Sequence, residues 1–278
     1  MSDKTEEEPF HANPVLLAPV AASLVVGVSC AYLIVKSEVR FPSVTPLPDV
    51  GFGPIFNAAI FVVLVSVGAS MIYLFLRRKM RGVIRFLIGF SITLVTFFLS
   101  YVYLWMLLSM LNVADVGLLT LLDGVLITVI VDLELFALHN IGGEIIILGL
   151  GGALGTFLGA AIPTLSAVLI LLFLAAYDII AVFRGPVGKI ATEGSEYLRG
   201  LSFSFRDIQM GLGDLTFYSM LVSHAWIFFG AWASTGGIVG VLAGSFLSFK
   251  MLERKGMFPG LPFSIALGLL GVLLVVVL

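Results

Sequence analysis

Two aspartates, Asp178 and Asp214, each lie inside a hydrophobic run that is long enough to cross a lipid bilayer. A carboxylate in hydrocarbon costs about 3 kcal/mol or more, so an acid at such a position points to a function. Two carboxylates held close together cannot both ionise cheaply, and the pair then holds one proton, which makes one member a base and the other an acid. The base can take a proton from a water molecule that attacks a peptide carbonyl, while the acid hydrogen-bonds the carbonyl oxygen and helps to protonate the leaving amine. The two residues therefore permit hydrolysis of a peptide bond by water, without a cofactor.

The neighbours of the two acids narrow this chemistry. Gly211 and Gly213 precede Asp214 closely, and their lack of side chains lets a neighbouring helix, a water molecule or a substrate strand approach the backbone there. The pattern Gly-x-Gly-Asp is a weak signal alone. It becomes specific because Asp178, preceded by Tyr177, lies on the neighbouring hydrophobic run. Tyr177 is also typical of a residue that only marks the membrane interface.

The amino-acid composition indicates a membrane protein. Hydrophobic residues make up 60% of the chain, against about 45 to 50% in soluble domains, and charged residues only 12%. Burial in one water-soluble core is excluded, so we expect an integral membrane protein. The first ten residues carry four acids rather than the basic start of a signal peptide, so the first hydrophobic run is expected to remain as a span. No basic tail indicates nucleic-acid binding, and the single Cys30 excludes an intrachain disulfide.

Runs of about 17 to 25 apolar residues, the length that crosses the hydrocarbon layer, predict nine membrane helices and an all-α fold. The division at Pro163 follows from the rule that a proline is tolerated in the first turn of a helix but breaks its interior. The polar stretch 184–207 contains several glycines and a proline, which predicts a mobile cytosolic loop. We therefore expect a single membrane domain over residues 1–278, with spans one to six in 14–183, the loop in 184–207 and spans seven to nine in 208–278. The nine spans are expected at residues 14–35, 54–76, 83–110, 116–138, 145–162, 163–183, 208–230, 234–251 and 262–278.

Lysines and arginines determine the orientation, because positive residues are retained on the cytoplasmic side. With the N-terminus inside, the inner segments hold thirteen of the fifteen lysines and arginines, and the outer segments hold only Lys36 and Arg40. The sequence therefore predicts a cytoplasmic N-terminus and an outer C-terminus.

This orientation places the two acids at matching depth. Asp178 lies six residues before Arg184 on a span that runs inward, and Asp214 lies six residues after Ile208 on a span that runs outward. At 1.5 Å per helical residue, both sit about 9 Å inside the cytosolic boundary. The two carboxylates are therefore expected to face each other across a pair of helices.

Two spans carry a small residue at every fourth position, a pattern that lets helix backbones approach closely. We expect these stripes to serve packing rather than chemistry. They consist of Gly151, Gly155 and Gly159 on the fifth span and Gly236, Gly240 and Gly244 on the eighth.

Other polar residues in the spans have simpler interpretations. Asp132 and Glu134 lie two positions apart, hence on different helix faces, and with Asp123 they form a rival acidic group that we interpret as solvated or paired within the protein. His224 is ten residues beyond Asp214, about 15 Å along a helix, so we expect a buried, hydrogen-bonded histidine. The spacing of the histidines and the one cysteine forms no metal site.

Three motifs together resemble a known family. Tyr177-Asp178, Gly211-Leu212-Gly213-Asp214 and Pro259-Gly260-Leu261-Pro262 are similar to the signatures of the presenilin and signal peptide peptidase family, the GxGD intramembrane aspartyl proteases. Archaeal members resemble the chain most closely, which implies the cell membrane of a microbe. The resemblance covers nearly the whole chain and implies a presenilin-like fold of nine spans, with the acids on spans six and seven. The inward N-terminus resembles presenilins, since signal peptide peptidases are inverted.

The resemblance also implies roles for single residues. Asp178 and Asp214 would be the catalytic pair, supported by Tyr177, Gly211 and Gly213. Substrates would be single-span membrane proteins or signal-peptide remnants, held by Leu212 and by the segment Pro259, Gly260, Leu261 and Pro262. Neither a metal nor a cofactor is implied, and a homo-oligomer is compatible with the family. Gly260 departs from the family, which usually has alanine there, and this bears on substrate geometry more than on catalysis.

Two alternatives stay open from the sequence. Intramembrane carboxylates also serve ion or proton carriers and cation leak channels, although such carriers commonly show paired, interrupted spans in corresponding halves, and that symmetry is not evident here. Prepilin peptidases share Gly-x-Gly-Asp, but they resemble a shorter architecture with a lysine soon after the acid, whereas Leu215 and Thr216 follow here.

Overall fold

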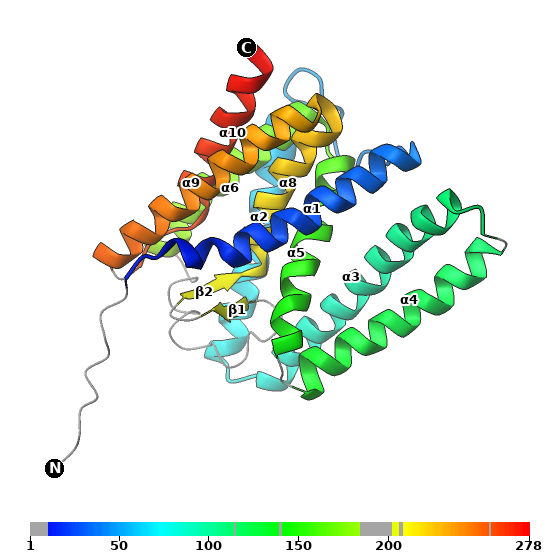
Figure 1. Ribbon diagram of the computed structural model, residues 1–278. Coiled ribbons are helices and arrows are strands. Elements are labelled where there is room, and N and C mark those ends of the chain that lie inside the picture. The colour runs from blue at the N-terminus through cyan, green and yellow to red at the C-terminus, as the bar shows by residue number, and fades with distance from the viewer. Residues whose placement is uncertain (1–10, 114, 139–140, 184–201, 206–207, 256) are drawn as a thin grey trace.

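Nine α-helices and a short β-hairpin make up the described part of the chain (Figure 1). The computed structural model describes residues 11–113, 115–138, 141–183, 202–205, 208–255 and 257–278. A 3₁₀ turn, Pro14–Leu17, leads into the first helix, and the fourth helix continues as a π-helical segment, Leu133–Leu138. The elements are α1 (Ala18–Ser37), α2 (Gly53–Arg77), α3 (Arg81–Met110), α4 (Val116–Asp132), α5 (Ile141–Ala161), α6 (Thr164–Phe183), β1 (Ser202–Phe205), β2 (Ile208–Gly211), α8 (Leu212–Phe229), α9 (Ala231–Lys255) and α10 (Leu261–Val277).

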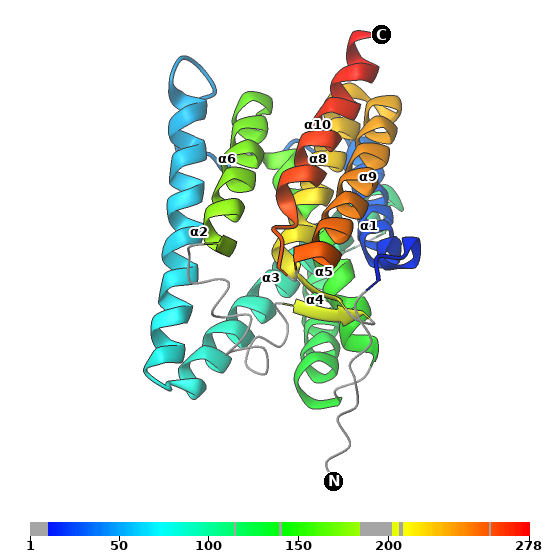
Figure 2. The same cartoon turned by 90° about the vertical axis from the view of Figure 1, so that its left-hand side faces the viewer.

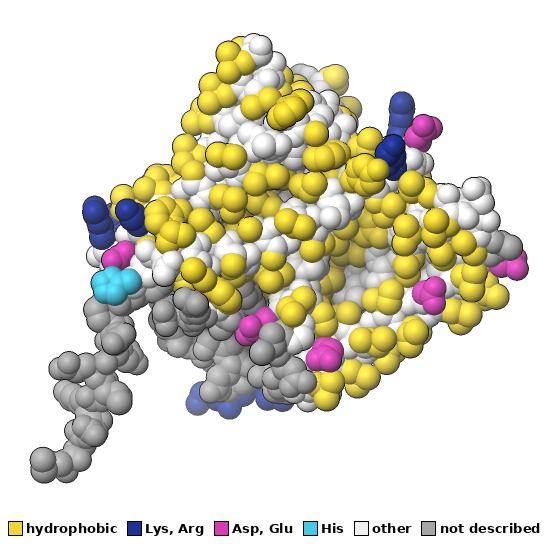
Figure 3. All heavy atoms as spheres, in the orientation of Figure 1, with side chains coloured by type: hydrophobic (Ala, Val, Ile, Leu, Met, Phe, Trp, Pro, Cys, Tyr) yellow, Lys and Arg dark blue, Asp and Glu magenta, His cyan; other side chains and the backbone are white. Residues whose placement is uncertain are grey.

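The helices confirm the predicted all-α membrane fold. Seven helices of the described residues are long and apolar enough to cross a bilayer, and α10 adds a shorter apolar helix of 17 residues. Apolar side chains also cover much of the face shown in Figure 3. On α2, for example, Val63, Leu64 and Val67 are each more than half exposed. Such a surface is stable when lipid covers it, and the protein is an integral membrane protein.

The break between the fifth and sixth spans is confirmed at Pro163. Helix α5 ends at Ala161 and α6 begins at Thr164. The carboxylate of Asp49, from the connection before α2, accepts hydrogen bonds from the backbone N–H groups of Leu165 (3.2 Å) and Ser166 (2.9 Å). It therefore caps the first turn of α6, whose N–H groups have no partner within the helix.

The start of the seventh span differs from the prediction. Residues 208–211 were expected to be helical, but they form strand β2, which pairs with β1 in an antiparallel hairpin from Phe205↔Ile208 to Ser202↔Gly211. The reason is a period of two, since Ile208 and Met210 are buried while Gln209 between them is exposed. Gly211 is still extended, with φ −79° and ψ 145°, so the helix begins only at Leu212.

The predicted loop over 184–207 is only partly described. Residues 184–201 and 206–207 lie outside the described residues, so the expected mobility stays a prediction, as does the single-domain division of the chain. Ser202–Phe205 at its end is strand β1 rather than loop.

Helix α8 is the centre of the bundle. All residues from 215 to 225 except Phe217 are buried. Helix α5 packs against it along the first glycine stripe, where a Cβ on Gly155 would come within 2.3 Å of the Thr216 carbonyl oxygen. The second stripe lies against α10 in the same way, since a Cβ on Gly240 would come within 2.1 Å of the Leu267 carbonyl oxygen. The prediction that both stripes serve packing is confirmed.

The other helices divide between the two sides of this centre. Helix α6 packs mainly on α2 and α10, whereas α8 packs mainly on α5, α1 and α9. Helices α3 and α4 form a hairpin that extends away from the rest of the bundle (Figures 1 and 2). The two helices that carry Asp178 and Asp214 therefore belong to different packing groups.

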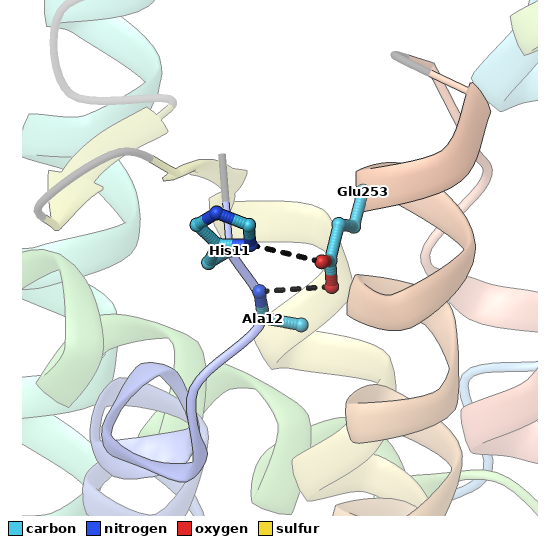
Figure 4. Close-up of polar contacts among 3 residues, drawn as sticks. All are labelled: His11, Ala12 and Glu253. Carbon is cyan, nitrogen blue, oxygen red and sulfur yellow. Dashed lines mark hydrogen bonds and ion pairs between the residues drawn. The ribbon is translucent and has the colours of Figure 1, made fainter. Parts of the chain in front are cut away.

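The chain before α1 is fastened to the end of α9 (Figure 4). Glu253 accepts hydrogen bonds from the backbone N–H of Ala12 (3.1 Å) and from the ring of His11 (3.1 Å between Nδ1 and Oε1). This contact joins residues 242 positions apart in the sequence. It holds the start of α1 beside the end of α9.

Candidate active site

Asp178 lies on α6, five residues before the helix ends at Phe183. Its side chain is half-buried, and its Oδ2 accepts a hydrogen bond from the backbone N–H of Leu261 at 3.1 Å. A hydrogen bond from a backbone N–H group stabilises the ionised form of a carboxylate.

Asp214 is the third residue of α8, in the first turn of the helix. It lies against Gly260, because a Cβ on Gly260 would stand 3.0 Å from its Oδ2 and 3.3 Å from the Tyr218 hydroxyl. A cavity of about 80 Å³ opens beside it, lined by residues of β2, α8 and α9 that include Met210 and Ser248. A space of this size holds a few water molecules.

The two acids therefore meet at one segment. Asp178 accepts a hydrogen bond from the N–H of Leu261, and Asp214 lies against the neighbouring Gly260. Pro259 and Leu261 are buried, while Gly260 and Pro262 are half-buried. The structure thus brings together all three motifs that the sequence singled out.

The calculation that placed Asp214 about 9 Å inside the cytosolic boundary rested on a wrong assumption. It assumed a helix from Ile208, with a rise of 1.5 Å per residue, but residues 208–211 are extended and rise about 3.3 Å each. The two acids come together because α10 begins between them.

The residues that were predicted to support catalysis or to bind substrate differ in their contacts. A Cβ on Gly211 or Gly213 would meet only ordinary van der Waals contacts, with the nearest atoms 3.9 and 4.0 Å away. Leu212 packs toward Gly151 on α5. Tyr177 is half-buried, and within the described residues no hydrogen bond joins its hydroxyl to Asp178. The roles of these residues stay predictions.

The remaining polar residues of the spans have the predicted structural roles only in part, since Asp132 Oδ1 and Glu134 Oε2 are buried and have no hydrogen-bond partner among the described residues. His224 is buried, with Nδ1 2.7 Å from the Gly159 carbonyl oxygen and Nε2 3.1 Å from the Thr164 hydroxyl. Asp132 accepts a hydrogen bond from Thr93 at 2.8 Å, on the α3–α4 hairpin. A search of the described residues finds no group of three His, Cys, Asp or Glu side chains that could hold a metal ion.

A set of hydroxyl groups beside the acids was not predicted. Tyr218, Ser248 and Ser264 each donate a hydrogen bond to the Gly260 carbonyl oxygen, and Ser245 lies 3.0 Å from Ser264. Part of this set could have been found from spacing, because Tyr218 follows Asp214 by four positions and Ser264 follows Gly260 by four, which places each pair on one helix face.

Comparisons with known proteins bear on the fold of the chain. No protein-family model matches the sequence. Presenilin-B of Dictyostelium discoideum is 33% identical over 121 residues, which cover 39% of this chain and 25% of that protein. The matched region thus spans a quarter of the length of the curated relative.

Solved structures extend the match to nearly the whole chain. Two crystal forms of a presenilin family intramembrane aspartate protease are similar. The C222 form has a TM-score of 0.68 and 21% identity, and the match covers 94% of this chain and 98% of that one. The P2 form has a TM-score of 0.64 and 20% identity, and the match covers 94% and 95%. The resemblance expected from the three motifs is confirmed, and the chain has the fold of the presenilin family.

Proposed function

We propose that the protein is an intramembrane aspartyl endopeptidase that hydrolyses peptide bonds of single-span membrane proteins or signal-peptide remnants. The observation that carries this proposal is the meeting of Asp178 and Asp214, from two helices, at the Gly260–Leu261 segment. The fold shared with a presenilin family protease and the sequence match to Presenilin-B support it.

In the proposed mechanism, the Leu261 N–H favours the carboxylate form of Asp178, which makes Asp178 the base and Asp214 the acid. A water molecule attacks the substrate carbonyl carbon and gives a proton to Asp178, while the proton on Asp214 passes to the carbonyl oxygen. The diol intermediate then breaks its C–N bond. The leaving amine takes the proton from Asp178, and a hydroxyl of the diol returns a proton to Asp214, so both residues end as they began.

The substrate must lose its helical form before water can reach it, because a membrane helix satisfies its own backbone groups. We propose that the unwound substrate end pairs as a strand with the backbone of the predicted loop, 184–207, or with the Pro259–Pro262 segment. Strand β2 supports this, since it leads directly into Asp214. Deleting part of the loop should reduce cleavage and leave the carboxylate pair in place; unchanged turnover would discard the idea.

Cleavage of a defined peptide tests the main proposal. The purified protein in detergent or lipid is incubated with a single-span peptide, and fragment masses are compared for the unaltered, Asp178→Ala and Asp214→Ala forms. Asp132→Ala is the matched control, because it removes another membrane acid that lies on the α3–α4 hairpin. We expect loss of the fragments in the first two variants and their persistence in the control.

The same preparations test the ion-carrier alternative. In sealed vesicles, a carrier or leak would show ion flux that depends on the two aspartates but no peptide fragments. That outcome would reject the protease.

We also propose the orientation with the N-terminus in the cytoplasm and the C-terminus outside, supported by the basic residues Arg77 and Arg254 at the ends of α2 and α9. Cysteines introduced at positions 79 and 278, in a Cys30→Ala background, should react with an impermeant thiol reagent from opposite sides of the membrane. Labelling of both from one side would contradict this orientation.

A further inference from the structure

The peptide unit between Gly260 and Leu261 is held at both ends. Its carbonyl oxygen accepts a hydrogen bond from the Tyr218 hydroxyl at 3.0 Å, and its N–H donates to Asp178 Oδ2 at 3.1 Å. A trans peptide unit is planar, and its C=O and N–H point in opposite directions. Fixing the carbonyl therefore fixes the direction of the N–H. One rigid group connects a hydroxyl on α8 with a carboxylate on α6.

Two serines complete the set of hydroxyl groups around this carbonyl. Ser248 on α9 donates at 3.3 Å and Ser264 on α10 at 3.1 Å. The bond from Ser264 is the common one to the carbonyl four residues earlier in a helix. Tyr218 and Ser248 come from two other helices, and they are only 1% and 4% exposed. A carbonyl oxygen has two lone pairs, so three hydroxyls exceed what simple pairing requires.

The burial of these hydroxyls makes their bonds effective in fixing geometry. Bulk solvent does not reach these donors, and breaking such a bond costs a buried hydrogen bond. The Gly260 carbonyl is thus held from α8 and α9, neither of which is a main packing partner of α6.

We propose that Tyr218 and Ser248 are positioning residues, which hold the Gly260 carbonyl so that the Leu261 amide points at Asp178. This inference rests on the proposed function, because it assigns a catalytic consequence to the orientation of Asp178. Both hydroxyls act through the Gly260–Leu261 peptide.

The test compares the full-length protein with variants of single hydroxyl groups. Tyr218→Phe keeps the ring and removes the hydroxyl, and Ser248→Ala removes the second donor. Tyr103→Phe is the matched control, because it removes a tyrosine hydroxyl that donates to a backbone carbonyl, that of Ala153 at 2.8 Å, between α3 and α5.

Tyr218→Phe should lower kcat about tenfold and leave KM unchanged, since a misplaced reacting group costs rate rather than binding. The acid limb of its pH–rate profile should move, because the amide donor of Asp178 is no longer held in place. The double variant with Ser248→Ala should lose less than the product of the two single effects, since both act on one carbonyl. Ser248→Thr, which keeps a hydroxyl, should retain activity, and Tyr103→Phe should behave like the unaltered protein.

Failure of this inference is distinguishable from failure of the proposed function. If the unaltered protein cleaves and Tyr218→Phe has the same kcat and pH profile, the positioning role is wrong and the protease stands. If the unaltered protein does not cleave, the positioning role is tested by infrared difference spectra, with the Asp178 carboxyl band assigned by Asp178→Asn. That band should shift in Tyr218→Phe and not in Tyr103→Phe; an unchanged band overturns the inference. If Tyr218→Phe does not fold, the cleavage kinetics and the infrared spectra of Ser248→Ala test the inference in its place.

Discussion

Gly260 lies so close to Asp214 that a methyl group on its Cα would stand 3.0 Å from the Oδ2 of that carboxylate. The family that the chain resembles usually has alanine at this position. The backbone of Gly260 is helical, with φ −77° and ψ −40°, so alanine fits the conformation and the contact alone decides the effect.

Gly260→Ala should therefore separate stability from activity. Alanine loses less backbone freedom on folding, so the melting temperature should stay the same or rise. The Asp214 carboxyl must shift by a few tenths of an ångström, and kcat should fall about tenfold or less. Thermal melting and cleavage rates check this together; a large loss of stability would show that the backbone is not as described.

Removing both acids should cost no more than removing one. Asp178→Asn and Asp214→Asn should each reduce kcat by about a thousandfold or more, because neither carboxyl group can act as acid and base at once. The double variant should retain the same residual rate as each single variant. Additive losses, measured with the same peptide, would indicate that the two groups act in separate steps.

The rate of cleavage should be bell-shaped in pH. At low pH both carboxyl groups hold a proton and no base is left, whereas at high pH both are ionised and no acid is left. The maximum is expected at mildly acidic to neutral pH, where the pair holds one proton. Initial rates from pH 4 to 9 check this, and equal rates across that range would contradict a shared proton.

The glycine stripe on α5 should determine stability rather than chemistry. Gly155→Ala places a Cβ within 2.3 Å of the Thr216 carbonyl oxygen and should destabilise the fold by about 1 to 3 kcal/mol.

Gly149→Ala on the same helix is the matched control. It meets nothing within 4 Å and should be neutral or stabilising by up to about 1 kcal/mol. Thermal or denaturant unfolding in detergent checks both variants. Equal stabilities would show that α5 and α8 are not in close contact at Gly155.

Much of the site could be predicted from the sequence because acidic residues inside a hydrophobic run are rare and point to a function. Asp178 and Asp214 are costly there, and the length of the apolar runs predicted the helices around them to within a few residues. Pro163 marked a helix boundary because proline cannot occupy a helix interior.

The β-hairpin and the hydroxyl groups around the Gly260 carbonyl could not be predicted from local sequence patterns. The strand over Ile208–Gly211 shows a period of two across only four residues, and its partner lies in a segment that reads as loop. The hydroxyls of Tyr218 and Ser248 converge on the Gly260 carbonyl from helices that are distant in sequence. Such convergence depends on tertiary packing, which periodicity does not report.

The first turn of α10 connects two parts of the bundle. Asp178 lies on α6, which packs mainly on α2 and α10, and Asp214 lies on α8, which packs mainly on α5, α1 and α9. Both acids touch this turn, Asp178 at Leu261 and Asp214 at Gly260. A change in the backbone of this one peptide therefore reaches both carboxyl groups at once.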